Sequence, residues 1–95
     1  MESNESKYLE LVQQTANEII KKKGHSSKIQ ISYKRVVHQN NQRWVEVGCT
    51  IVVAGKANNS SFNVQFYEEE TNHFLIAEVE KGIEDCLRTY QNFGI

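Results

Sequence analysis

The sequence predicts a single α+β domain in which an amphipathic helix, a three-stranded antiparallel meander and a second amphipathic helix follow one another, with both helices on one face of the sheet. Three observations support this fold class. Apolar residues recur at helical spacing near both ends of the chain, and they alternate with polar residues between positions 43 and 54. The length of 95 residues suffices for one domain and not for two.

The first helix is predicted over residues 7–23. Its apolar positions recur every three to four residues and form one stripe: Tyr8, Leu11, Val12, Ala16, Ile19 and Ile20. Ser6 can accept the hydrogen bond of an N-cap. Lys21, Lys22 and Lys23 suit the negative end of the helix dipole, and Gly24 can adopt the left-handed conformation that ends a helix.

Alternation of apolar and polar residues predicts three strands, over residues 28–38, 43–54 and 61–67. The first strand points its odd positions toward the core, with Arg35 as the exception, and these are Ile29, Ile31, Tyr33 and Val37. The second strand also points its odd positions inward, namely Val45, Val47, Cys49, Ile51 and Val53. The third strand points Phe62, Val64 and Phe66 inward.

Whether the inward positions of a strand are odd or even constrains the lengths of the turns, because facing residues in a sheet point to the same side. The first two strands both use odd positions, so a two-residue turn at Asn40-Asn41 is excluded and a turn of three or five residues is expected. The next loop must have an even number of residues. Pairing Val53 with Phe62 sets Gly48 opposite Tyr67, whose ring could cover the bare glycine.

The second helix is predicted over residues 72–93, with Gly94 as a C-terminal stop. Its apolar stripe comprises Ile76, Val79, Ile83, Cys86, Leu87 and Tyr90. An alternative remains open at this stage. Residues 74–79 could form a fourth strand, and the helix would then begin near Glu80.

The order helix, three strands, helix resembles that of double-stranded-RNA-binding domains, and the resemblance is one of element order alone. Those domains carry a lysine cluster at the start of their second helix, where this chain has Glu68, Glu69, Glu70 and Asn72. With a fourth strand, the order would instead resemble that of cystatin-like folds.

The residues that could carry chemistry are scattered. His25, His38, His73, Cys49 and Cys86 show none of the spacings of a metal site. Gly55-Lys56 lacks the upstream glycine and the following Ser or Thr of a phosphate-binding loop. The carboxylates of residues 72–93 have the spacing of a solvated helix face. We therefore expect no enzyme activity, no metal and no cofactor.

The composition favours a cytoplasmic protein that does not enter a membrane. The chain has no apolar run near the ~18 residues of a membrane span, and its start lacks the basic and apolar regions of a secretory signal. Two cysteines on apolar faces suit a reducing compartment, where they pack as small hydrophobic side chains. The sequence leaves open whether Cys49 and Cys86 are close in space.

The charge is unevenly distributed, although the net formal charge is only −1. Residues 21–56 carry eight Lys and Arg residues and one Glu, which suggests nucleic-acid binding as an alternative function. Its candidate residues are Lys21, Lys22, Lys23, Lys28, Lys34 and Arg43. The negative net charge and the acidic second helix argue against it.

The function that the sequence favours is a non-catalytic module that binds protein, as a homodimer, an adaptor or an inhibitor of a larger partner. The outer face of the sheet is predicted to present apolar side chains to a partner, and they are Trp44, Val36, Val52 and Tyr67. Trp44 is the expected anchor, because exposed tryptophan is enriched where partners bind.

Overall fold

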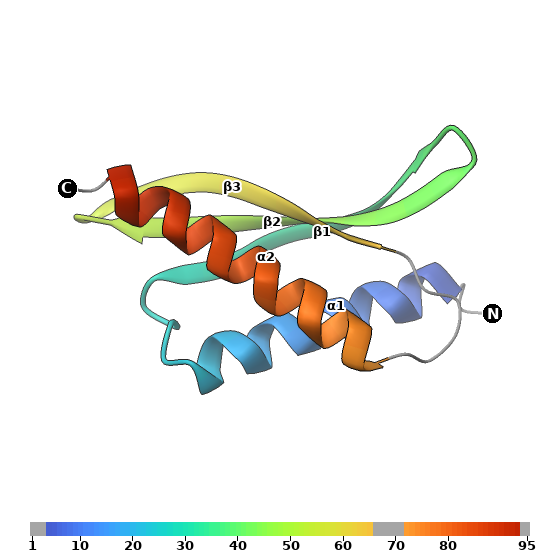
Figure 1. Cartoon of the computed structure of the whole chain (residues 1–95), viewed down its shortest axis with the longest axis horizontal. Helices are drawn as coiled ribbons and strands as arrows, with labels where there is room; N and C mark the ends of the chain where they lie inside the picture. The colour runs from blue at the N-terminus through green and yellow to red at the C-terminus, as the bar shows by residue number, and fades with distance from the viewer. Residues whose placement is uncertain (1–3, 66–71, 94–95) are drawn as a thin grey trace.

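The computed structural model describes residues 4–65 and 72–93. Its elements are α1 (Asn4–Lys22), β1 (Ile29–Gln39), β2 (Gln42–Val53), β3 (Lys56–Gln65) and α2 (Asn72–Phe93). The three strands form one antiparallel sheet in the order β1-β2-β3. Both helices start at the same end of the molecule and run alongside one another (Figure 1). The predicted α+β class and order of elements are confirmed.

The core lies between the two helices and one face of the sheet. β2 contributes the side chains predicted from its alternation, and Val45, Val47, Cys49 and Ile51 are all buried. α1 contributes its predicted stripe, of which Leu11 is partly buried and the other members are buried. Burying a Val, Leu or Ile side chain stabilises a fold by roughly 1.5–3 kcal/mol, so this core supplies most of the driving force.

Local backbone conformation and hydrogen bonds account for the end of α1 and the start of β1. α1 ends at Lys22, and Gly24 follows in the left-handed conformation (φ 73°), as predicted. His25 then bridges to the sheet, because its carbonyl oxygen accepts hydrogen bonds from the backbone N–H groups of Lys28 (2.8 Å) and Ile29 (3.1 Å).

A β-bulge in β1 overturns the predicted register of the first hairpin. The pairing with β2 shifts between Ile31 and Tyr33, so Ser32 has no partner of its own. An extra residue reverses which positions face the core. Tyr33 and Val37 therefore lie on the outer face and Val36 packs against the core, which is the opposite of the prediction for all three residues.

The same bulge permits the two-residue turn that the predicted inward positions of the first two strands had excluded. Asn40 (φ 50°) and Asn41 (φ 63°) form a two-residue turn between the paired residues Gln39 and Gln42. Two successive left-handed residues match the twist of the flanking strands. The predicted turn of three or five residues is wrong, because the prediction assumed an uninterrupted first strand.

The second hairpin is tighter than predicted. Ala54 (φ 52°) and Gly55 (φ 77°) make a two-residue turn, and β3 begins at Lys56 rather than at residue 61. The even loop length is confirmed, but Val53 pairs with Lys56 and not with Phe62. Val64 is buried and Phe62 packs against the core, as expected; Phe66 lies outside the described residues.

α2 has the predicted bounds, and the alternative of a fourth strand over residues 74–79 is wrong. Val79, Ile83, Cys86 and Leu87 are buried as predicted. Ile76 is 45% exposed, and Leu75, at 2%, takes the expected core position instead. The side chain of Tyr90 lies outside the described part of the helix.

Candidate functional site

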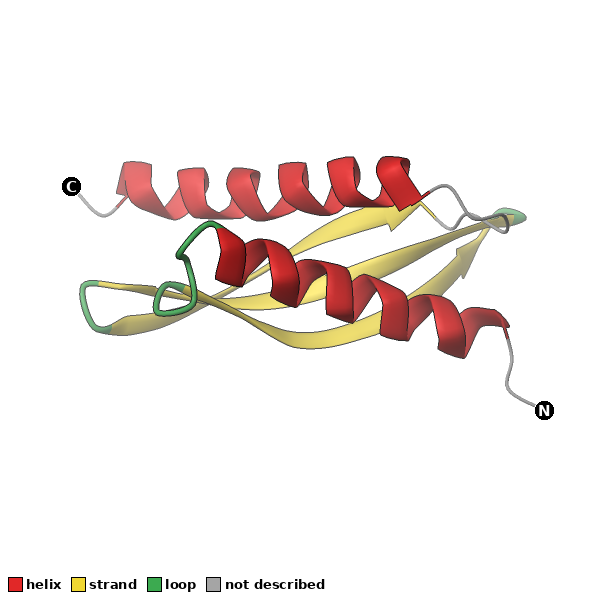
Figure 2. Ribbon diagram, turned by 90° about the horizontal axis from the view of Figure 1, so that it is seen from below, coloured by secondary structure: helices red, strands yellow, loops and turns green. Residues whose placement is uncertain are grey.

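Neither of the two described helices covers the outer face of the sheet. Figure 2 shows α1 and α2 on the same side of the three strands. The register places three adjacent positions from each strand on the opposite, outer face, and these are Tyr33, Arg35 and Val37 of β1, Trp44, Glu46 and Gly48 of β2, and Ser61, Asn63 and Gln65 of β3. We call these nine residues the outer face.

Glu46 lies at the centre of a hydrogen-bonded cluster on the outer face. Its Oε1 accepts hydrogen bonds from the Tyr33 hydroxyl and from Nε of Arg35, both at 2.9 Å. The bond from Tyr33, followed by the bond from Arg35, lowers the pKa of the Glu46 carboxyl. The same bond raises the pKa of Tyr33. Since Arg35 and Glu46 neutralise one another, the centre of the face combines an aromatic ring with a balanced ion pair.

Gly48 is covered by an aromatic ring, but not by the predicted one. The ring of Tyr33 occupies the space that a Cβ at Gly48 would need, and the two residues face each other across β1 and β2. Tyr67, the predicted cover, lies outside the described residues. The absence of a side chain at Gly48 therefore fixes Tyr33 against the sheet, where it remains 46% exposed.

Of the four residues predicted to bind a partner, the structure describes three and separates them. Trp44 lies on the outer face as predicted, half-buried, and its neighbour on β1 is Val37 rather than Val36 or His38. Val52 is also on this side of the sheet and 43% exposed, but it lies eight residues along β2, near the opposite turn. Val36 faces the helices, and Tyr67 is outside the described residues. Sequence analysis missed Tyr33 and Val37 as neighbours of Trp44.

Two of the basic residues predicted for nucleic-acid binding are held in ion pairs within the chain. Lys23 lies 3.0 Å from Glu84 and 3.5 Å from Glu80, both on α2. The hydrogen bond from Lys23 lowers the pKa of Glu84. Arg43 donates a hydrogen bond from Nη1 to Oε2 of Glu5 (3.2 Å). These pairs tie α1 and its following loop to α2, and the first hairpin to α1.

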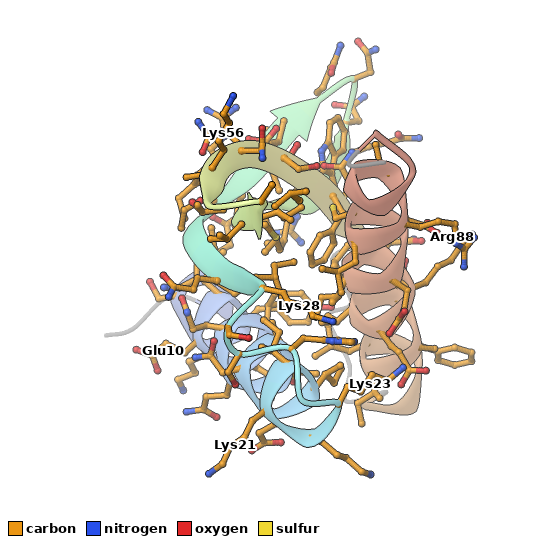
Figure 3. All side chains as sticks on the ribbon, turned by 90° about the vertical axis from the view of Figure 1, so that its left-hand side faces the viewer. Glu10, Lys21, Lys23, Lys28, Lys56 and Arg88 are labelled. Atoms are coloured by element: carbon orange, nitrogen blue, oxygen red, sulfur yellow. The ribbon has the colours of Figure 1, made fainter. Side chains whose placement is uncertain are left out.

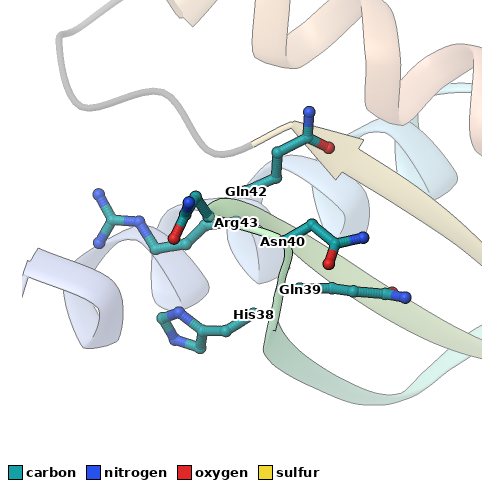
Figure 4. Close-up of a pocket in the computed structure, with 6 residues that line it drawn as sticks. His38, Gln39, Asn40, Gln42 and Arg43 are labelled. Atoms are coloured by element: carbon teal, nitrogen blue, oxygen red, sulfur yellow. The ribbon is translucent and has the colours of Figure 1, made fainter.

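The tip of the first hairpin bears a shallow hollow of about 380 Å³, lined by residues 38–43. Figure 4 shows the side chains of His38 and Arg43 extending toward α1, whereas the amides of Gln39, Asn40 and Gln42 point away. Nε2 of His38 lies 3.3 Å from the Glu5 carboxylate. This arrangement holds the hairpin on α1 and brings no nucleophile and general base together.

Four other lysines are spread around the end of the molecule opposite the start of α1 (Figure 1). Lys21 and Lys22 close α1, Lys28 precedes β1 and Lys56 begins β3. Figure 3, which faces this end, shows Lys21, Lys28 and Lys56 around it. Among the described residues, none of the four lysines makes an ion pair. Lys34 lies apart from them, at a half-buried position on the helix side of β1.

Cys49 and Cys86 meet between β2 and α2. Both are free thiols and both are buried. Ser60, which pairs with Cys49 in the sheet, donates a hydrogen bond to Sγ of Cys86 (3.4 Å). The neighbouring Cys49 thiol lowers the pKa of Cys86, whereas the Cys86 thiol, together with burial, raises the pKa of Cys49. Both sulfurs occupy core positions, away from the solvent that a reactive thiol needs.

The described residues contain no group of three His, Cys, Asp or Glu side chains that could hold a metal ion. Neither of the helices described has an apolar stretch long enough to cross a bilayer. Comparison of the chain with protein-family models, with curated proteins and with solved structures gives no match.

Proposed function

We propose that this protein is a non-catalytic binding module that forms a homodimer through the outer face of its sheet. The observation that carries the proposal is the combination, on an uncovered sheet, of the Trp44–Val37 pair with the exposed ring of Tyr33. Tyrosine and tryptophan dominate the energetics of protein interfaces, because they bury a large area and lose little conformational entropy.

Charge favours a second copy as the partner. The ionised side chains of the outer face are Arg35 and Glu46, which are already paired at 2.9 Å. Two neutral faces can meet without repulsion, and in a twofold dimer each patch must complement itself. The remaining members of the face are small or amide side chains, which can exchange hydrogen bonds across such an interface.

Replacing Trp44 by alanine should weaken the dimer by about 2 kcal/mol, which is roughly a 30-fold increase in Kd. The monomer fold should lose no more than about 1 kcal/mol, the size of a cross-strand pair with Val37. Sedimentation equilibrium measures the first effect and thermal unfolding the second.

Val52→Ala is the matched control, because Val52 lies on the same side of the sheet but at its other end. It should leave the Kd unchanged. A Trp44→Ala variant with a lowered melting temperature and an unaltered Kd would show that the indole merely covers the sheet. A wild-type chain that stays monomeric at high concentration would contradict the dimer itself.

A second candidate function, nucleic-acid binding, is favoured by the four lysines at one end of the molecule that make no ion pair with any described residue. If they contact phosphates, affinity for a single-stranded oligonucleotide should be measurable at ~50 mM salt and should fall steeply as salt rises. Replacing Lys21, Lys22, Lys28 and Lys56 by glutamine should reduce both the affinity and the salt slope, as fluorescence anisotropy would show.

The control for this experiment replaces Lys7 and Lys81, on the exposed sides of α1 and α2, by glutamine. These changes remove charge without touching the basic end and should have little effect. Absence of binding by the wild-type protein at ~50 mM salt would rule out this candidate, since low salt strengthens every surface attraction.

A further inference from the structure

The two edges of the sheet differ in how they are covered. On β3, Oε1 of Glu78 accepts a hydrogen bond from the backbone N–H of Gln65 (3.4 Å), and the Tyr8 hydroxyl donates one to the Gln65 carbonyl (2.9 Å). The thiol of Cys86 lies 3.8 Å from the carbonyl oxygen of Ser61. Side chains of both helices therefore occupy the β3 edge.

The β1 edge presents its backbone groups outward. Val52 donates a backbone hydrogen bond to the Lys28 carbonyl (2.8 Å), so Lys28 points its backbone toward β2 and the alternate residues Ile29 and Ile31 point away. Beyond the bulge, the alternation of backbone groups that point toward β2 and away from it shifts by one residue. Gln39 and Gln42 flank a two-residue turn and pair with each other, so the backbone of Gln39 points toward β2. There Lys34 and Val36 point away from β2.

Within the described residues, no protein group makes a hydrogen bond to the outward backbone groups of Ile31, Lys34 or Val36. Such groups form a ready template for another strand. The bulge and Lys34 restrict which strand can pair, because a lysine at an edge disfavours uncharged or basic neighbours.

A groove runs between this edge and α1. Its volume is about 280 Å³, and it is lined by Asn17 and Ile20 of α1, Ser26 of the connecting loop, and Ile29, Gln30 and Ile31 of β1. A strand added beside β1 would point alternate side chains to the helix side of the sheet. The groove lies where those side chains would fall, and its apolar lining comes from the three isoleucines.

The charge around the edge is positive. β1 contains no acidic residue. Its Arg35 and His38 already face Glu46 and Glu5, whereas Lys34, and Lys28 directly before the strand, make no ion pair with the described residues. On α1, helical spacing places Lys21 and Glu10 on the same side as Asn17, which lines the groove. Figure 3 shows Lys21 and Glu10 both on the left of the view. Along this groove, the lysines Lys21, Lys28 and Lys34 therefore outnumber the carboxylate of Glu10.

We propose that the β1 edge binds an extended acidic segment of a partner protein, which adds to the sheet as a fourth strand. Main-chain hydrogen bonds supply affinity in this mode and alternate side chains supply specificity. A second copy of β1 is disfavoured here because like charges would face each other. The proposal goes beyond the dimer and uses another surface, since Trp44 lies on the outer face and not at this edge.

The test uses a fluorescein-labelled ten-residue peptide in which glutamate and valine alternate, and a matched peptide with lysine in place of glutamate. We expect saturable binding of the acidic peptide alone, measured by fluorescence anisotropy. N-methylation of every second backbone amide of the acidic peptide should abolish binding when the methylated amides are those that face β1. Hydrogen exchange should show the amides of Ile31 and Val36 slowing when the peptide is added.

Lys34→Glu should raise the peptide Kd about tenfold, because one attraction becomes a repulsion. Lys34→Gln should lie between this variant and the wild type, and Lys81→Glu, on the exposed side of α2, is the matched control. Trp44→Ala should bind the peptide normally, so failure of the dimer and failure of this proposal are distinguishable.

Three results would overturn the proposal. The first is equal binding of the acidic and basic peptides. The second is binding of the acidic peptide without slower exchange at Ile31 and Val36. The third is protection of these amides by raising the protein concentration alone, which would assign the edge to a second copy.

Discussion

Replacing Ile51 by aspartate is expected to lower the free energy of unfolding by about 3–5 kcal/mol, because an unpaired carboxylate would enter the core. Ile51 is 1% exposed and lies on the central strand, between Ile29 on β1 and Asn58 on β3. No basic side chain is among the buried residues described, so nothing compensates the charge. A domain of this size has a total stability of roughly 5–14 kcal/mol, and the variant would lose a large share of it.

Urea denaturation followed by circular dichroism measures this loss. Val52→Asp is the matched control, because Val52 is the next residue of the same strand and is 43% exposed on the other side of the sheet. Its cost should stay below about 1 kcal/mol. Equal losses for the two variants, or an Ile51→Asp protein as stable as the wild type, would show that the faces of β2 are wrongly assigned.

The elements that the sequence predicted best are those whose pattern is uninterrupted. β2 places Val45, Val47, Cys49 and Ile51 at alternate positions, and one buried face follows directly from that alternation. The bounds of α2 and the left-handed glycine after α1 also follow from local signals, because helix periodicity and capping depend on neighbouring residues alone. These predictions needed no knowledge of tertiary contacts.

The register of β1 could not be obtained in the same way, because a bulge is one extra residue with no fixed sequence signal. Two features of the sequence nevertheless point to the bulge. Arg35 broke the inward pattern, and Asn40-Asn41 is well suited to a two-residue turn, since asparagine tolerates positive φ. Together they require a change of parity inside the strand, and Ser32 supplies it.

The composition of the candidate site was missed for this same reason. With the parity of β1 reversed, Tyr33 and Val37 join Trp44 on the outer face, and Val36 moves to the helix side. Trp44 itself was placed on the correct face, because its position depended on β2 alone. The pairing of Lys23 with Glu84 joins residues 61 positions apart, and no local pattern reveals such a contact.

Gly82 has a role that the apolar periodicity of α2 did not indicate. It is buried on the side of the helix that faces the sheet, and a Cβ at this position would overlap the ring of Phe62 on β3. The atoms involved are at the base of the ring and near its middle, so a small rotation of the side chain cannot clear them. The absence of a side chain therefore sets how closely α2 approaches β3.

Gly82→Val should destabilise the protein by about 2–3 kcal/mol, because overpacking forces either the helix or Phe62 to move. In thermal unfolding, this corresponds to a fall in melting temperature of roughly 10–20 °C for a domain of this length. Ala77→Val, at an exposed position of the same helix, is the control and should cost only the difference in helix propensity, about 0.5 kcal/mol.

The double variant Phe62→Ala/Gly82→Val distinguishes a clash from a general effect of valine. If the two side chains compete for one space, its loss should be smaller than the sum of the single losses by about 1–2 kcal/mol. Strictly additive losses would mean that Gly82 does not determine the approach of α2 to Phe62.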